Sequence, residues 1–227
     1  IDKIGSAPSS FAPHLVIENV GLDISSHFSY IIHNYDDLPE FMAFIHGHEH
    51  AYHQMHDRPL LDVISGANIS KYEYIPLNNF MRCYRFHNEP SNVEGIPGLM
   101  LADHWVRLGL KPLPLGYKMY IPLSCQFIVS RKRIQRIPKI CWQEWLNLVT
   151  KGSREEIFTW CTVFEYLLHV LLGEFPDMDI KDDWFSFPYK IKWWNELPEF
   201  RLSEDEKREK GIEIIERPPS SWADQVR

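Results

Sequence analysis

Phe41-Met42-Ala43-Phe44-Ile45 leads directly into His46-Gly47-His48-Glu49-His50, and this stretch decides the fold class. The five apolar residues are too few for a helix and are bounded by polar and turn-forming residues, which indicates a buried strand. In open α/β sheets, ligands bind beyond the carboxyl ends of the strands. The stretch therefore predicts a binding site where the strand ends and the histidines begin.

Further patterns predict helices and a second strand around this one. Residues 25–35 carry apolar side chains at three- and four-residue spacing, and Ser25 or Ser26 can cap the helix. Ser153 and Glu156 form a capping box that predicts a long helix from Arg154 to Leu172. Residues 125–129 have the length and apolar content of another buried strand. Strands that alternate with helices indicate a mixed α/β domain.

Changes in composition divide the chain into three parts. Residues 1–175 carry the α/β pattern, although residues 72–88 combine aromatic side chains with a proline and asparagines and predict irregular structure. Residues 176–202 are aromatic without a clean period, which predicts an arm that covers the domain. Residues 203–227 are charged and then rich in proline and serine, as in a solvated tail or linker.

The overall composition excludes several classes of protein. The 227 residues are 44% hydrophobic, enough for a sizeable core, and no apolar run reaches the length of a membrane span. A net charge of −7 argues against a nucleic-acid surface, which would need a basic stripe. The four cysteines form no CxxC pair, and the chain shows no signal-peptide pattern, so we expect a cytoplasmic protein with free thiols.

The histidines after the first buried strand form the clearest chemical cluster. Histidine and carboxylate side chains are the ligands of zinc, iron or manganese, and the cluster contains His46, His48, Glu49, His50, His53, His56 and Asp57. The spacing matches neither HExxH nor the His-x-His-x-Asp-His pattern of metallo-β-lactamases. Two interpretations stay open, a site that includes at least His46 or His48, and a polar loop in which histidines gathered by chance.

Glu165 and His169 form a second candidate site. They stand four residues apart and therefore share one face of the predicted long helix. As an ordinary helical pair they would contribute only about 0.2 to 0.5 kcal/mol. Apolar neighbours surround them, and a carboxylate in such a setting is a candidate general base.

The second predicted strand carries polar residues at both ends. Gln126 offers a donor and an acceptor that suit a sugar hydroxyl. Arg131 begins a basic turn, and its guanidinium fits phosphate oxygens in a bidentate way. The alternative is that the strand is simply core and the turn, from Arg131 to Arg136, is a solvated helix start.

Several of these motifs resemble domain of unknown function 3431, a family found in fungi, bacteria and some large viruses. The resemblance covers about residues 2–173 and lies in the following stretches: Asn19-Val20-Gly21, Tyr30 to Pro39, Phe44 to His48, Cys125 to Arg131, and Phe164 to His169. The family has no settled activity. Its layout is similar to that of GT-A glycosyltransferases, in which a strand end carries Asp-x-Asp for the diphosphate of a nucleotide sugar and a metal.

This resemblance implies an α/β fold with a GT-A-like sheet flanked by helices. His46-Gly47-His48 stands where Asp-x-Asp is expected, which puts metal dependence in question. The family's opening strand is missing, so the sequence leaves open whether the sheet has its first strand. The implied activity is transfer of a sugar from a nucleotide-sugar donor to a glycan or other hydroxyl acceptor.

The resemblance also implies a role for each candidate residue. The roles are catalysis for Glu165 and His169, donor binding for His46, His48 and Arg131, acceptor binding for Gln126 and Glu49, and a possible Mn²⁺ or Mg²⁺ for His46 and His48. A metal-dependent hydrolase that uses His46, His48, His50 and His169 is one alternative. A non-catalytic carbohydrate-binding module is the other.

Overall fold

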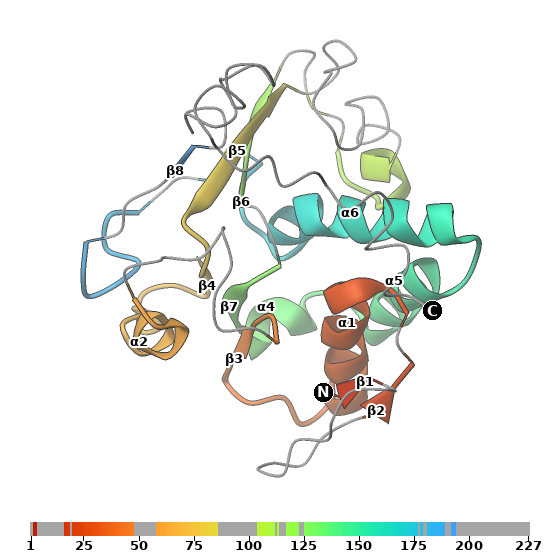
Figure 1. The fold of residues 1–227 in the computed structure, drawn as a ribbon, viewed down its shortest axis with the longest axis horizontal. Helices are drawn as coiled ribbons and strands as arrows, with labels where there is room; N and C mark the ends of the chain where they lie inside the picture. Colours follow the sequence, from red (N-terminus) through yellow and green to blue (C-terminus); the bar gives the residue numbers. More distant parts are fainter. Residues whose placement is uncertain are drawn as a thin grey trace, which may run out of the picture.

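The structure is a computed structural model. It describes residues 2–3, 16–18, 20–47, 58–85, 104–111, 113, 117–122, 125–176, 178, 181–188 and 192–193. The strands in these ranges are β1 (Asp2–Lys3), β2 (Val16–Ile17), β3 (Phe41–Phe44), β4 (Tyr74–Pro76), β5 (Phe80–Arg85), β6 (Lys118–Pro122), β7 (Phe127–Ser130) and β8 (Lys192–Trp193). The labelled helices are α1 (Leu22–Asn34), α2 (Leu60–Ser65), α4 (Arg131–Gln135), α5 (Lys139–Thr150) and α6 (Arg154–Leu171), as Figure 1 shows, and residues 104–107 are also helical.

The central sheet has the order β3–β7–β4, and β7 is antiparallel to both neighbours. Phe44 pairs with Phe127 at one end of this sheet, and Phe41 pairs with Ser130 at the other. The carboxyl ends of β3 and β4 therefore lie at one edge, together with the start of β7. We call this end of the strands the carboxyl edge, and the opposite end of the strands, where β7 ends and α4 begins, the amino edge. Neither name refers to an edge strand.

A second sheet has the order β6–β5–β8, and β1 pairs with β2 separately. The prediction of irregular structure over residues 72–88 is wrong, because β4 and β5 lie there. Pro76 and the asparagines at 78 and 79 interrupt the alternation of apolar and polar residues that would indicate a strand. Both strands are short, and Pro76 is the last residue of an edge strand, where proline is tolerated. The strands that pair with β4 and β5 are distant from them in sequence.

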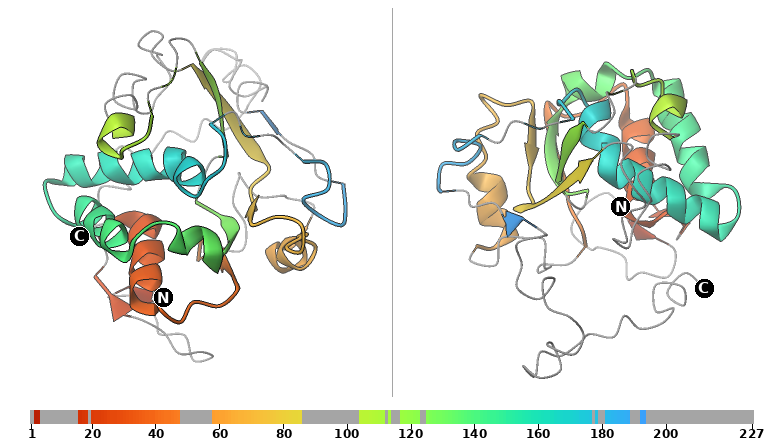
Figure 2. Two further views of the ribbon diagram at one scale, coloured as in Figure 1. Left: turned by 180° about the vertical axis from the view of Figure 1, so that it is seen from behind. Right: turned by 90° about the horizontal axis from the view of Figure 1, so that it is seen from above.

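The helices α1, α5 and α6 lie together on one side of the sheets, with α2 on the other (Figure 2). Phe28 of α1 is fully buried and meets Trp142 of α5 and Phe164 of α6 edge to face, at 5.4 and 5.0 Å between ring centroids. Burial of such a side chain stabilises the fold by roughly 1.5 to 3 kcal/mol. No helix in the described ranges is long and apolar enough to span a bilayer.

Helix α1 begins earlier than its serines predict. It starts at Leu22 instead of Ser25, and neither serine caps it, because Gly21 in the left-handed region (φ 79°) turns the chain into the helix. The Ser25 hydroxyl donates to the carbonyl oxygens of Val20 and Leu22. An acidic residue, Asp23, consequently lies in the first turn.

Two further helices begin with a serine cap. Ser130 caps α4 by accepting a hydrogen bond from the Arg133 N–H at 3.2 Å. Ser153 and Glu156 form the predicted capping box at the start of α6, which ends before Gly173 in a left-handed conformation (φ 93°). These signals are local, so the sequence alone identifies them.

Part of the aromatic segment packs against the domain. Trp184 and Phe185 are buried in the main core, and Ser186 N–H donates to the Gly66 carbonyl at 2.8 Å. Asp183 accepts hydrogen bonds from Lys71 Nζ and the Tyr72 hydroxyl. The three-part division of the chain stays a prediction, and residues 203–227 lie outside the described residues.

Candidate functional site

The end of β3 is held by a buried chain of amides. The His46 N–H donates to Gln126 Oε1 at 2.9 Å, and Gln126 Nε2 donates to Asn78 Oδ1 at 2.9 Å. Gln126 and Asn78 are both buried, and they come from the start of β7 and from the residues just after β4. The chain of amides therefore joins all three strands of the central sheet at its carboxyl edge.

Gln126 was expected to face an acceptor. In the structure, the oxygen and the nitrogen of its side-chain amide both form hydrogen bonds with protein groups. These contacts orient the backbone where the histidine motif begins. Contact with an acceptor stays a prediction.

His46 faces an acidic residue that the sequence analysis did not select. Its Nε2 lies 3.5 Å from Oδ2 of Asp23, in the first turn of α1. The His46 side chain is 11% exposed and that of Asp23 55%, so the pair lies at the surface with the imidazole partly covered. An acidic residue two positions after Gly21 was the available signal, but its helical position depends on the glycine turn.

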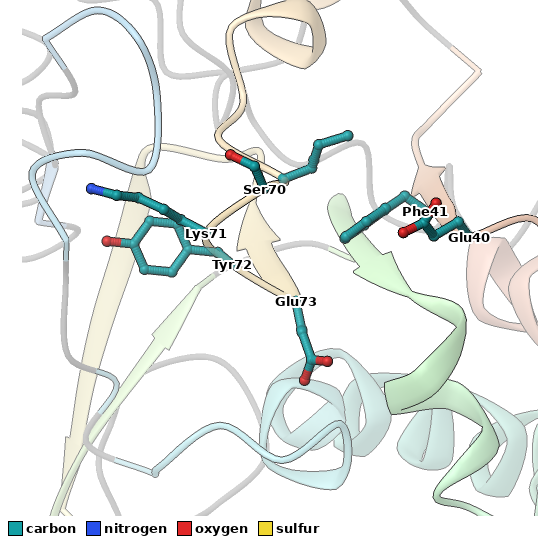
Figure 3. Close-up of a pocket in the computed structure, with 7 residues that line it drawn as sticks. Glu40, Phe41, Ser70, Lys71, Tyr72 and Glu73 are labelled. Atoms are coloured by element: carbon teal, nitrogen blue, oxygen red, sulfur yellow. The ribbon is translucent and has the colours of Figure 1, made fainter.

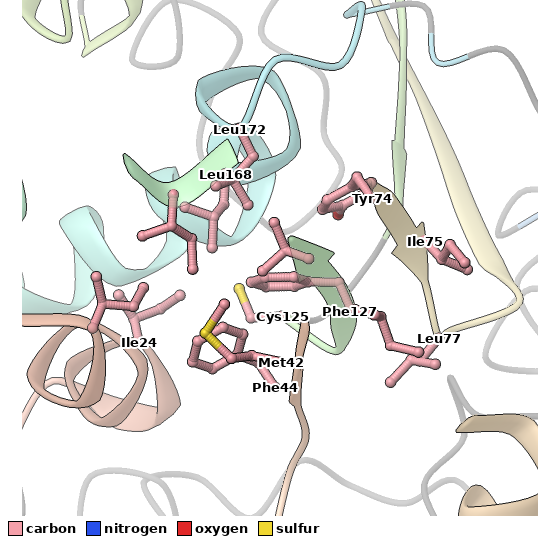
Figure 4. Packing of buried hydrophobic residues seen from close by; sticks show 14 of the residues in the cluster. Ile24, Met42, Phe44, Tyr74, Ile75, Leu77, Cys125, Phe127, Leu168 and Leu172 are labelled. Carbon is pink, nitrogen blue, oxygen red and sulfur yellow. The ribbon is translucent and has the colours of Figure 1, made fainter. Parts of the chain in front are cut away.

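The charge of Glu165, on α6, acts on Cys125 at the start of β7. The Cys125 thiol is buried, and this burial raises its pKa well above the ordinary value, as do the charges of Glu165, Asp23 and Cys161. Figure 4 shows Cys125 among side chains of α1, β3, β7 and α6. The carboxylates of two helices thus act on one thiol at the start of β7.

His169 lies one turn further along α6 and is 1% exposed. Among the residues that the structure describes, neither of its ring nitrogens has a hydrogen-bond partner, and burial lowers its pKa to about 3. The imidazole is therefore neutral and a weak base near pH 7. Its catalytic role stays a prediction.

Arg131 lies at the amino edge instead, apart from His46. Its Nη1 donates to the Leu38 carbonyl at 3.0 Å, and its N–H donates to the Glu40 carbonyl at 2.8 Å. The whole of β7 separates it from Gln126, at roughly 3.3 Å per strand residue. The structure therefore does not bring Arg131 together with His46, the other described residue that was expected at the donor.

The rest of the basic turn is paired with carboxylates of the protein. Glu73 lies 2.9 Å from Lys132 Nζ and 3.5 Å from both Arg133 Nε and Arg136 Nη2, and these cations lower its pKa. Arg133 also contacts Glu174 at 2.6 Å. This pairing favours a structural interpretation of the turn.

A groove of about 450 Å³ lies at the amino edge. Figure 3 shows Glu40 and Phe41, from the start of β3, across from the segment that precedes β4. The lining residues are Glu40, Phe41, Ile69, Ser70, Lys71, Tyr72 and Glu73. None of these residues was selected from the sequence.

Several predicted site residues cannot be placed. His48, Glu49 and the later histidines of the cluster lie outside the described residues. Among the residues that are described, no group of three or more histidine, cysteine or acidic side chains is arranged to hold a metal ion.

The unpartnered His169 should make the fold sensitive to acid. Its pKa is about 3 when folded and 6.5 as the reference value, so below pH 6.5 the unfolded chain takes up a proton that the folded chain does not. We expect this group alone to lower the free energy of unfolding by about 2 kcal/mol between pH 7 and pH 5. Urea titrations of the wild type and of His169→Leu at both pH values measure the difference.

Exposed His33, on α1, supplies the control. His33→Gln should show the same pH dependence of the free energy of unfolding as the wild type. His169→Leu should lack the part of that dependence that His169 causes. Equal pH dependence in the wild type and His169→Leu would show that His169 takes up its proton in the folded state.

The fold and this edge define a class of protein, a mixed α/β domain with a small antiparallel central sheet and acidic and histidine side chains grouped beyond a strand end. Residues 7–183 match the family model described as protein of unknown function DUF3431, and the chain belongs to that family. The resemblance to this family is confirmed, and the match includes the start of the aromatic segment. Neither the curated proteins nor the solved structures contained a match.

Proposed function

We propose that this chain is a glycosyltransferase that moves a sugar from a nucleotide-sugar donor to a hydroxyl of a glycan or another acceptor. The observation that carries the proposal is the contact between Asp23 of α1 and His46, just beyond the carboxyl end of β3, with Glu165 of α6 near enough for its charge to act on Cys125 at the start of β7. The GT-A-like layout of the sequence motifs supports the same site.

The proposed chemistry needs one proton acceptor. The acceptor hydroxyl attacks the anomeric carbon, the bond from that carbon to the diphosphate breaks, and the nucleoside diphosphate leaves with the bonding electrons. Glu165 takes the hydroxyl proton, which makes it the general base. Its place on the rigid helix α6, one turn beyond buried Cys161, gives the carboxylate a fixed position.

In this proposal, residues at the end of β3 bind the donor. His46, and His48 after it in sequence, would bind the diphosphate directly or through a divalent cation, which would neutralise the leaving group. Asp23 joins this side because of its contact with His46. Arg131 is left out, since it lies at the amino edge.

A thermal-shift screen tests the proposal. The full chain is melted with UDP-, GDP- and dTDP-sugars, each with and without manganese. We expect one nucleotide to stabilise the fold, by about 2.7 kcal/mol at a hundredfold excess over its Kd. Stabilisation by zinc alone would favour the metal-dependent hydrolase, and stabilisation by free glycans alone would favour a carbohydrate-binding module. Either of these outcomes contradicts the transferase.

A further inference from the structure

The groove at the amino edge has the size of a small-molecule site. Its volume of about 450 Å³ lies within the range of roughly 300 to 1,000 Å³ that is usual for ligand pockets. Figure 3 shows the Phe41 side chain directed from the start of β3 toward the segment of residues 69–73. Ile69 lines the groove on that segment and is 42% exposed. Each of the two walls therefore offers apolar surface to a ligand.

Both walls are tied to the end of β7. The Ser130 N–H donates to the Glu73 carbonyl oxygen at 2.8 Å. The next N–H along the chain, that of Arg131, donates to the Glu40 carbonyl oxygen, also at 2.8 Å. Two consecutive backbone groups thus set the spacing of the walls. A groove with fixed walls loses little freedom when a ligand binds, which favours affinity.

The charges around the groove are balanced by the protein itself. Lys71 is the cation among the lining residues, and its ammonium group contacts the Asp183 carboxylate. Figure 3 shows the side chains of Lys71 and Tyr72 directed away from Phe41, and Asp183 accepts hydrogen bonds from both. Glu73 contacts three cations of the basic turn. The lining residues therefore provide no unpaired cation for a phosphate or carboxylate ligand.

The remaining polar groups suit the hydroxyl groups of a neutral ligand. Glu40 is exposed, and its carboxylate makes no ion pair with another residue in the described part of the chain, while Ser70 adds an exposed hydroxyl. Carboxylate oxygens accept hydrogen bonds, and a serine hydroxyl both donates and accepts. A sugar ring has hydroxyls at its rim and C–H groups on its faces. It can therefore bond to these groups while one face lies against Phe41 or Ile69.

We propose that this groove binds a neutral saccharide unit, with Phe41 and Ile69 against the ring and Glu40 bonded to its hydroxyls. Within the proposed function, the unit belongs to the acceptor glycan and lies away from the reacting hydroxyl, and this assignment alone rests on the transferase. A basic peptide attracted by the two carboxylates is the competing occupant. It would have to displace the three cations that already contact Glu73.

Disaccharides in the absence of any nucleotide are the probes for the groove. The full chain is titrated with maltose, cellobiose, lactose, mannobiose and diacetylchitobiose, and binding is followed by saturation-transfer NMR. Amide hydrogen exchange then locates the site. We expect at least one disaccharide to bind and to slow exchange in peptides that cover residues 69–74, with unchanged exchange over residues 22–27. Binding of none of the five would overturn the inference.

Glu40→Ala is the decisive variant, because Glu40 is exposed and its loss should leave the melting temperature unchanged. Glu40→Ala and Phe41→Leu should each weaken binding of the disaccharide by about fivefold or more. Glu155→Ala and Phe158→Leu replace exposed residues of α6 and should bind as the wild type does.

Equal affinity in the wild type and Glu40→Ala would overturn the inference, as would tighter binding of tetralysine than of any disaccharide. Because these titrations contain no nucleotide, either result would leave the nucleotide screen of the proposed function unaffected. Failure of the groove and failure of the transferase are therefore distinguishable.

Discussion

Replacement of Gly21 with alanine is expected to destabilise the fold by about 2 to 5 kcal/mol. A Cβ atom at this position would lie 2.3 Å from the Val149 backbone oxygen and 2.8 Å from Ser25 Cβ. Crowding of this kind costs about 1 to 3 kcal/mol. The left-handed conformation, with φ of 79°, adds roughly 1 to 2 kcal/mol for a residue with a Cβ. Urea unfolding followed by tryptophan fluorescence measures the loss.

Gly109 separates the two contributions. It has a similar φ of 75°, but a Cβ atom there would meet nothing within 4 Å. Gly109→Ala should therefore show only the conformational penalty, and the difference between the two variants gives the cost of the clash with α5. If Gly21→Ala is no less stable than Gly109→Ala, the contact between the start of α1 and the end of α5 is looser than the structure shows.

Replacement of Glu165 with glutamine should lower the rate of sugar transfer by roughly 10² to 10⁴-fold and leave the melting temperature unchanged. Glutamine keeps the size and most of the hydrogen-bonding capacity of the side chain, but it cannot take the proton of the acceptor hydroxyl. Transfer is measured at a saturating concentration of the nucleotide sugar that stabilises the chain. The donor affinity should change little, because the role that we propose for Glu165 is on the acceptor side.

Glu155→Gln provides the matched control, since Glu155 is exposed and lies on the same helix. It should keep the wild-type rate. Wild-type transfer by Glu165→Gln would assign the proton acceptor to another residue and make the position of Glu165 structural.

Local signals in the sequence predicted much of this fold. The apolar run of β3 and the capping box of α6 each act within a few residues, and both elements lie where they were expected. β4 and β5 were missed, because two short strands around Pro76 and the asparagines are defined by their partners β7 and β6. The start of α1 was misplaced because a glycine turn, instead of a serine cap, begins the helix.

The residues of the candidate site also divide into those that the sequence identified and those that it missed. His46, Gln126 and Glu165 were selected by residue type at element ends or on a helix face. The structure joins His46 to Gln126 by a hydrogen bond, and the charge of Glu165 acts on Cys125, which precedes Gln126. Asp23 was missed because its contact with His46 depends on how α1 packs. Arg131 was grouped with them because it follows the same strand as Gln126. However, β7 is antiparallel to β3, so the end of β7 lies beside the start of β3 and away from His46.

The central claim is that a nucleotide sugar binds at the carboxyl edge, and amide hydrogen exchange tests it most directly. Exchange is compared in the full chain with and without a saturating amount of the stabilising nucleotide sugar. We predict slower exchange in peptides that cover residues 22–27 and 42–47, and unchanged exchange in peptides that cover residues 69–74 at the groove. Protection confined to residues 69–74 and 131–136, at the amino edge, would contradict the proposed site.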